Sequence, residues 1–207
     1  MKKIMFMTVV ATLLLAYAGV AQANVITGNL WHVPEGVVNN ATGAIPANVP
    51  GTTPNVTFDV NSPFNFSGTG ATVGAWLASS AAFNIVENTP GTLASLMDNF
   101  STGTILNFLG QVTVTNGQTF TVTHDDGLTL IIGALTVISA PGPTSPVVTT
   151  ATYTGPSGTF PFQLVYSECC SGPAVLQIDL PLTNVPEPAT MLLLGLGLLG
   201  LAATRKH

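Results

Sequence analysis

Apolar and polar residues alternate along much of the middle of the chain, which is the pattern of β-strands with one buried face. Two segments show it most clearly, and their apolar positions of one parity are Phe160, Phe162, Leu164 and Tyr166 in the first and Ala174, Leu176, Ile178 and Leu180 in the second. Such segments recur at short spacing, with turns rich in Gly and Pro between them. The pattern predicts an all-β fold, either an antiparallel sandwich or a barrel.

Two short turns predict β-hairpins. Asn116-Gly117 separates the alternating segments 111–115 and 119–124, and this dipeptide favours a two-residue hairpin turn. Gly133-Ala134 separates residues 128–132 from 135–139 in the same way. We therefore expect each pair of segments to form neighbouring strands.

The first thirty residues of the predicted domain, 24–53, are rich in Asn, Pro, Gly and Val and show little periodicity. They predict one edge strand over residues 25–30, followed by a long loop. Trp31 follows that strand, and a place over the hydrophobic core is favoured for it over a role as a sugar-binding platform.

Residues 92–100 carry apolar side chains at helical spacing, namely Leu93, Leu96, Met97 and Phe100. This spacing predicts one short amphipathic helix. Three prolines among residues 141–146 predict a surface loop instead.

Basic residues are confined to the two ends of the 207-residue chain, at Lys2, Lys3, Arg205 and Lys206. Nucleic-acid binding is therefore excluded for the body, because that function requires cations that neutralise phosphates. Eight of the nine acidic residues lie between residues 24 and 184. They have no Lys or Arg to pair with, so we expect the body to bind a cation. Calcium is the candidate because it prefers oxygen ligands.

The N-terminus has the composition of a secretory signal peptide. Two lysines precede an apolar stretch from Ile4 to Leu15, and Ala21 and Ala23 form a small-residue cleavage site. The apolar stretch is too short to span a bilayer, which disfavours the alternative of a membrane anchor. We expect residues 1–23 to be removed and the mature chain to begin at Asn24.

The C-terminus has three successive parts: Val185-Pro186-Glu187-Pro188, an uncharged apolar stretch over residues 189–203, and a basic tail with Arg205 and Lys206. As a helix the apolar stretch is about 22 Å long, which is marginal for spanning a membrane. The basic tail would hold the end of the chain on the cytoplasmic side.

These three parts resemble the PEP-CTERM sorting signal of Gram-negative bacteria, in the same order and position as in that family. The resemblance implies export through the inner membrane, transient anchoring by the C-terminal helix, and recognition by a membrane enzyme, exosortase. The protein would then reach the cell surface or the extracellular matrix; a permanent membrane anchor is the alternative. The chain thus divides into a signal peptide (1–23), a β-sandwich domain (24–184) and a sorting segment (185–207).

His124-Asp125-Asp126-Gly127 stands between two predicted strands, where an Asp-Gly pair can form an ordinary turn. The surrounding residues 120–130, the later segment Leu164 to Glu168 and the apolar strand from Ala174 together resemble the PA-fourteen domain, a protective-antigen-type, jelly-roll-like β-sandwich. In sugar-binding members the Asp-Asp pair forms a cis peptide and holds a calcium ion that grips sugar hydroxyls. The resemblance therefore implies that Asp125 and Asp126 are calcium ligands. It assigns no further ligands, and many members keep the pair for architecture alone.

Cys169 and Cys170 are the only cysteines, and they are adjacent in a chain predicted to be exported. They form either a vicinal disulfide, or two thiols, or a bridge to a second molecule. Some sugar-binding relatives use a vicinal disulfide as an apolar plate, so Glu168, Cys169 and Cys170 form a candidate ligand loop.

These observations favour a non-catalytic surface protein that binds exopolysaccharide or another glycan with calcium. A structural matrix component without a ligand and a secreted glycan hydrolase are the alternatives. The hydrolase is disfavoured because no catalytic set with a recognisable spacing, such as G-x-S-x-G, occurs. The arrangement of the loops 124–127 and 168–173 discriminates among these functions, because a binding site requires both at one end of the sandwich.

Overall fold

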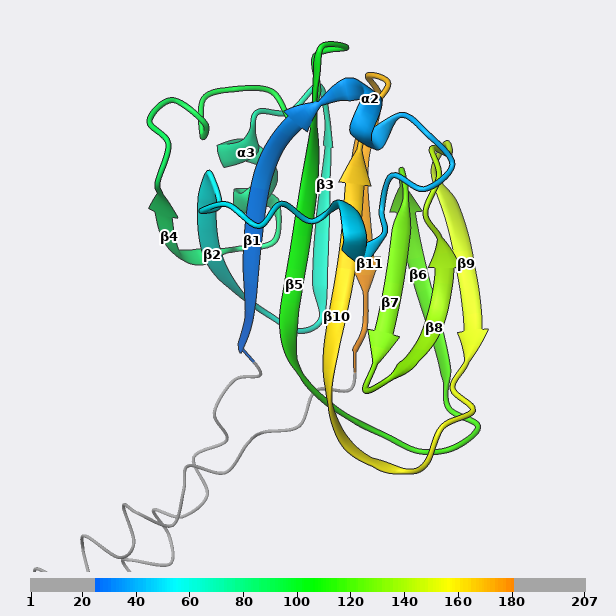
Figure 1. Ribbon diagram of the computed structural model, residues 1–207. Coiled ribbons are helices and arrows are strands. Elements are labelled where there is room, and N and C mark those ends of the chain that lie inside the picture. Colours follow the sequence, from blue (N-terminus) through cyan, green and yellow to red (C-terminus); the bar gives the residue numbers. More distant parts are fainter. Residues whose placement is uncertain (1–24, 181–207) are drawn as a thin grey trace, which may run out of the picture. The chain divides into compact units, whose positions relative to one another are not determined.

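A computed structural model describes residues 25–180, which form two antiparallel β-sheets packed face to face (Figure 1). The strands are β1 (Val25–Pro34), β2 (Val56–Asn61), β3 (Phe64–Thr69), β4 (Phe83–Glu87), β5 (Thr102–Val114), β6 (Thr119–Asp125), β7 (Leu128–Ile132), β8 (Leu135–Ala140), β9 (Val147–Thr152), β10 (Gly158–Glu168) and β11 (Pro173–Ile178). Three short helices, α2 (Glu35–Val38), η1 (Pro46–Asn48) and α3 (Val73–Ser79), complete the fold. The predicted signal peptide and sorting segment lie outside the described residues.

The larger sheet has seven strands in the order β4-β2-β1-β5-β10-β7-β8, and the smaller has four in the order β3-β11-β6-β9. Every strand pairing is antiparallel. The antiparallel sandwich predicted from alternation is confirmed. Within residues 25–180, no helix has the length and apolar character needed to cross a bilayer.

The main hydrophobic core lies between the two sheets and is rich in aromatic side chains. The rings of Phe64 and Phe108 stack with centroids 5.2 Å apart, and those of Phe66 and Trp76 with centroids 4.2 Å apart. Both alternating segments contribute as expected, with Phe162, Leu164, Tyr166, Ala174, Leu176, Ile178 and Leu180 buried in this core and Phe160 packed against it. Burial of these faces, at about 25 cal/mol per Å² of apolar surface, stabilises a domain that has no Lys or Arg for salt bridges.

A second, smaller core covers the outer face of the large sheet. The segment from α2 through η1 crosses that face (Figure 1) and packs its Val38 and Ala44 against Ile105 and Val165 of the central strands. Trp31 belongs to this cluster and is only 6 % exposed, with its indole N–H donating to the Thr52 carbonyl at 3.0 Å. The prediction that Trp31 covers a core is therefore confirmed.

One predicted hairpin forms and the other does not. β7 and β8 pair across Gly133-Ala134, with Ile132 opposite Leu135. β5 and β6, however, lie in different sheets: β5 pairs with β1 and β10, whereas β6 pairs with β11 and β9. Asn116-Gly117 instead turns the chain from one sheet to the other, and the Asn116 amide donates to the carbonyls of Thr154 and Gly155.

The helix predicted over residues 92–100 is absent, and turns occupy that segment. Its Ser95 carbonyl accepts from Val73 N and its Met97 N–H donates to the Ala71 carbonyl, so its backbone groups pair with residues at the start of α3 and just before it. The hydroxyls of Thr92 and Ser95 also donate to nearby carbonyls, a local alternative to helical hydrogen bonds. The helix is found at α3 instead, where the Thr72 hydroxyl accepts from the Ala75 N–H as an N-cap.

The strand predicted over residues 25–30 exists but is not at an edge. β1 continues to Pro34 and pairs with β2 on one side and β5 on the other. Gly28 permits this position because the Phe58 ring from β2 lies where a Cβ at residue 28 would be, 2.2 Å away. The N-terminal segment therefore contributes an interior strand. Because α2 follows β1 directly, it lies at the end of the sandwich where β1 ends.

Candidate functional site

Asp125 and Asp126 lie at the end of β6 and are joined by a cis peptide bond. Both residues are buried, and both carboxylate oxygens of Asp126 accept backbone hydrogen bonds. Thr144 N donates to Oδ1 at 3.0 Å and Cys169 N donates to Oδ2 at 2.7 Å. The Asp pair is thus fixed between the loop before β9 and the loop after β10.

The loop after β10 is closed by a disulfide between Cys169 and Cys170. The vicinal ring was one of the alternatives left open by the sequence, and it is the one observed. Cys170 and the following Ser171 adopt positive φ angles of 66° and 52°. This left-handed conformation turns successive backbone N–H groups toward one side of the loop.

Three successive amides of this loop hold three carboxylates from distant parts of the chain. Beside the Cys169–Asp126 bond, Cys170 N donates to Glu35 Oε1 at 2.9 Å and Ser171 N donates to Asp98 Oδ2 at 2.6 Å. Glu35 begins α2, and Asp98 lies in the loop before β5. The amides therefore gather an acidic site from four segments at one end of the sandwich. We call Glu35, Asp98, Asp125, Asp126 and Glu168 the carboxylate cluster.

Glu168 lies beneath the Asp pair and is 1 % exposed. The Tyr166 hydroxyl oxygen lies 2.6 Å from Glu168 Oε2 and also contacts the Asp125 carbonyl. Residues 166 and 168 stand at the end of β10, so this strand supports the peptide unit that carries the Asp side chains. The predicted candidate Glu168 is therefore part of the support below the Asp pair.

The carboxylates of the cluster repel one another when they are charged. No Lys or Arg side chain compensates this repulsion, because the described residues contain neither. Burial, followed by the charge of Asp126, raises the pKa of Asp125 to about 7. Burial and then the Asp126, Asp125 and Asp98 charges raise the pKa of Glu168 to about 9. Burial likewise raises the pKa of Asp126 and of Glu35. A bound divalent cation would relieve this repulsion.

The residues that could hold a cation are the carboxylates. Glu35 lies within 4.8 Å of both cysteine sulfurs, but those sulfurs are bonded to each other and offer no thiolate. Glu35 Oε2 is shielded from solvent and accepts no hydrogen bond. Residue 172 is glycine, so no side chain at this position covers Asp125. A Cβ there would lie 3.8 Å from Asp125 Oδ2. Oxygen ligands of this kind suit calcium.

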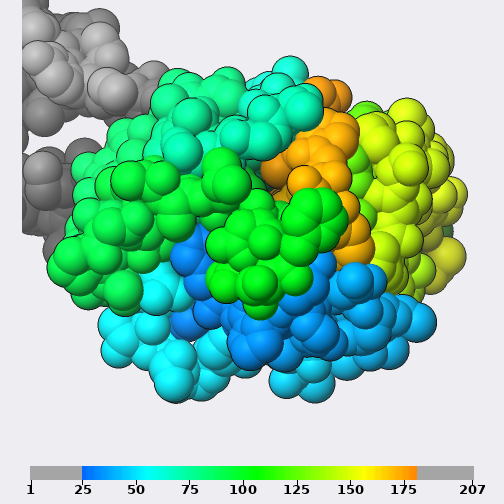
Figure 2. All heavy atoms as spheres, turned by 90° about the horizontal axis from the view of Figure 1, so that it is seen from above, coloured from blue at the N-terminus to red at the C-terminus, as the bar shows by residue number. Residues whose placement is uncertain are grey.

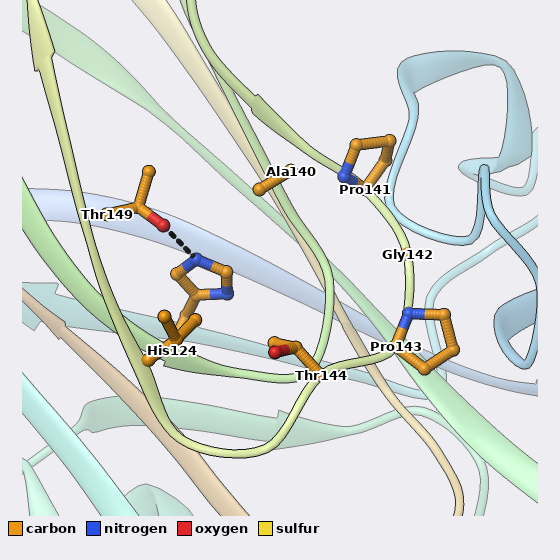
Figure 3. A pocket seen from close by; sticks show the side chains of 8 residues that line it. His124, Ala140, Pro141, Gly142, Pro143, Thr144 and Thr149 are labelled. Atoms are coloured by element: carbon orange, nitrogen blue, oxygen red, sulfur yellow. Dashed lines mark hydrogen bonds between the residues drawn. The ribbon is translucent and has the colours of Figure 1, made fainter.

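A pocket of about 260 Å³ adjoins the Asp pair and is drawn in Figure 3. The loop Pro141 to Thr144 forms one wall, and His124 and Thr149 form another. One ring nitrogen of His124 contacts the Asp126 carbonyl, and the other lies 2.8 Å from the Thr149 hydroxyl. The pocket thus shares His124 and Thr144 with the surroundings of the Asp pair.

The structure brings the two predicted loops, 124–127 and 168–173, together at one end of the sandwich. Glu35, Asp98 and Thr144 also belong to the site, although no motif marks them. Their only sequence signal is that Glu35 and Asp98 are two of few acidic residues in a chain without internal bases. Phe100, predicted to lie on a helix, projects from the same end in the loop that contains Asp98.

A family model described as the PEP-CTERM protein-sorting motif matches residues 184–206. The C-terminus therefore carries this motif, as the resemblance predicted. The motif implies export, processing by exosortase and sorting to the cell surface. No curated protein matches the chain.

Solved structures resemble the body of the chain. A "PA14 sugar-binding domain from RTX adhesin" is 19 % identical with a TM-score of 0.54, covering 77 % of this chain and 90 % of its own. The PA14 domain of the MpAFP antifreeze protein is 17 % identical with a TM-score of 0.49, covering 77 % and 82 %. A β-glucosidase from Kluyveromyces marxianus is 9 % identical with a TM-score of 0.38, covering 76 % and 15 %. The body is thus a sandwich that resembles PA14 domains.

Proposed function

We propose that the sandwich is a non-catalytic, calcium-dependent carbohydrate-binding domain that acts at the cell surface. Asp125 and Asp126 would hold the calcium ion, and sugar hydroxyls would complete its coordination. The disulfide ring of Cys169 and Cys170 would give the site an apolar wall. Eight acidic residues without Lys or Arg disfavour anionic polymers, so neutral exopolysaccharides are the ligand class that we propose.

The observation that carries this proposal is the convergence of the carboxylate cluster at one end of the sandwich. A turn that served only architecture would not require Glu35 and Asp98 to join Asp126 at one loop. Gathering these like charges costs free energy unless protons or a cation neutralise them. The similarity to a domain described as sugar-binding supports the choice of ligand.

The histidines support a non-catalytic role. His124 is fully buried, and both of its ring nitrogens have partners. The ring nitrogens of His32 also have partners, at 2.7 Å from the Ser95 hydroxyl and 3.1 Å from the Thr104 hydroxyl. Neither imidazole is free to act as a general base on a sugar substrate.

Calorimetric titration of calcium into the full chain, purified in mild detergent, tests the proposal. We expect saturable binding to the wild type and none to the Asp125→Asn, Asp126→Asn double variant. Asp179→Asn is the matched control because Asp179 is exposed and follows β11, at the opposite end of that strand from the loop 168–173. Immobilised dextran, mannan and galactan would then be tested with calcium and with EDTA.

Each outcome has a distinct meaning. Calcium binding with EDTA-sensitive retention on a polysaccharide would support the proposed function. Calcium binding without retention on any of them would refute the carbohydrate part, and absent calcium binding would favour a structural matrix component. Release of reducing sugar from the panel would favour a hydrolase.

A further inference from the structure

Phe100 is the most exposed of the large hydrophobic side chains in residues 25–180, with 69 % of its surface accessible. Full burial of such a side chain is worth about 1.5–3 kcal/mol, so this ring retains most of that free energy for a contact with another molecule. Single exposed apolar residues are common on protein surfaces. Exposure alone therefore does not assign a role, and the position and fixation of the ring decide it.

The loop that carries Phe100 is fixed by hydrogen bonds at several points. Asn99 Oδ1 accepts from Ser101 N at 3.1 Å and from Thr102 N at 2.9 Å, and the Ser101 carbonyl accepts from Glu35 N at 3.1 Å. Phe100 itself has a φ of 61°, in the left-handed region that non-glycine residues rarely adopt. The loop thus holds the ring away from both cores.

Asp98 connects this loop to the carboxylate cluster. Its carboxylate accepts from Phe100 N at 3.3 Å and from Ser171 N, beside the disulfide, at 2.6 Å. One side chain therefore fixes both the backbone of Phe100 and the loop that holds Asp126. In Figure 2 the bright green segment around residue 100 lies between the blue segment around residue 35 and the orange segment around residue 170.

An aromatic ring beside a cation site matches the two kinds of surface on a pyranose. Hydroxyl groups can enter the coordination shell of calcium, whereas the ring C–H groups form an apolar face that stacks on an aromatic plane. Sites with an apolar wall and a few fixed polar groups are typical of small-ligand recognition.

We propose that Phe100 is the stacking platform of the carbohydrate site and selects pyranoses that present an apolar face while their hydroxyls reach the cation. This inference rests on the proposed function of Asp125 and Asp126. It assigns the platform to the loop before β5 and not to Trp31, for which a platform was the less favoured alternative and which the structure buries. Phe100 would therefore affect sugar affinity without affecting calcium affinity.

The test compares Phe100→Ala, Phe100→Leu and Phe100→Trp in the full chain, with Leu109→Ala as a control for an exposed apolar residue on β5. Calcium affinity is measured by calorimetry, and retention is measured on immobilised dextran, mannan and galactan. We expect all variants to bind calcium like the wild type. Phe100→Ala should weaken polysaccharide binding about tenfold relative to the wild type. Phe100→Leu should bind nearly as weakly as Phe100→Ala, whereas Phe100→Trp should bind like the wild type.

Three results would overturn the inference in distinguishable ways. If the wild type binds a polysaccharide and Phe100→Ala binds it equally well, the platform is refuted and the proposed function stands. If the wild type binds calcium but none of the polysaccharides, the proposed function fails and the platform fails with it. A loss of calcium binding in Phe100→Ala would show that the residue supports the fold of the cluster and is not a platform.

Discussion

The hydroxyl oxygen of Tyr166 lies 2.6 Å from Glu168 Oε2, and it also contacts the Asp125 carbonyl. A hydroxyl has one proton to donate and a carbonyl can only accept, so one proton cannot serve both contacts. When Tyr166 donates to Asp125, the contact with Glu168 requires a proton on the carboxyl group. The raised pKa of Glu168, about 9, provides that proton at neutral pH. Glu168 is thus a neutral acid that supports the Asp125–Asp126 peptide.

The free energy of unfolding of the metal-free protein should fall as the pH rises from 7 to 9. The pKa of Asp125 is raised to about 7 and that of Glu168 to about 9, whereas carboxyl groups in the unfolded chain have pKa values of about 4. The folded state therefore binds more protons than the unfolded state in this range, and stability declines with pH. The lowered pKa values of His32 and His124 act in the opposite sense, but below about 6.5. Urea denaturation in EDTA at both pH values measures the change.

Saturating calcium should reverse that decline, because the ion binds the deprotonated cluster of the folded state. An EDTA sample whose urea midpoint is equal or higher at pH 9 would contradict the assigned protonation of the cluster.

Glu168→Gln should be more stable than the wild type at pH 9 and similar to it at pH 6. The glutamine amide can donate to Tyr166 as the protonated acid does, and it has no charge to acquire at high pH. The pH dependence of the urea midpoint should therefore flatten. Asp179→Asn, at an exposed position, should leave it unchanged. Equal loss of stability in Glu168→Gln at both pH values would show that the carboxylate itself is required.

Strand formation could be predicted from the sequence, whereas strand partners could be predicted only for β7 and β8, which the short turn Gly133-Ala134 joins. The alternation of apolar and polar residues over 160–166 predicts a strand with one buried face, and the structure confirms it. The same signal in residues 111–115 and 119–124 says nothing about which sheet each segment joins, because partners are selected by packing between residues far apart in the chain.

The site was predictable only where its residues are adjacent in sequence. Asp125 with Asp126, and Cys169 with Cys170, are neighbours that stand out in the sequence, although the disulfide was only one of the alternatives that it left open. Glu35 and Asp98 reach the cluster through the path of β1 and β5, so their role depends on the tertiary fold. The exposure of Phe100 likewise depends on a turn that replaced the expected helix.

Replacing Cys169 and Cys170 by serine should weaken calcium binding roughly tenfold. The disulfide ring holds a loop in which Cys170 and Ser171 have positive φ angles, and relaxation of that loop would redirect the amides that bind Asp126 and Asp98. Calorimetry with and without a phosphine reductant measures the effect. The reductant should weaken binding to the wild type and leave the serine variant unchanged; equal affinity in all four samples would contradict the role of the ring.

Gly127→Ala should lower the free energy of unfolding by about 2 kcal/mol, the typical cost of overpacking. A Cβ at residue 127 would lie 2.3 Å from the Pro141 carbonyl oxygen and 2.7 Å from the Ser167 hydroxyl. The backbone at Pro141 would have to move, and it leads into the Thr144 amide that binds Asp126. Gly51→Ala is the matched control because nothing lies within 4 Å of its Cβ position. Urea denaturation that shows equal stability for the two variants would refute the close approach.

The three amides of residues 169–171 bind carboxylates that precede them in the chain, and the Cys170–Glu35 contact spans 135 positions. A polypeptide that crosses a membrane amino end first therefore delivers every acceptor before any of the three donors. The acidic end of the sandwich can close only after β10 has been translocated. Occupation of the cluster by an external cation would thus mark a chain that has emerged at least to residue 171, and it would bias that chain against sliding back into the translocation channel.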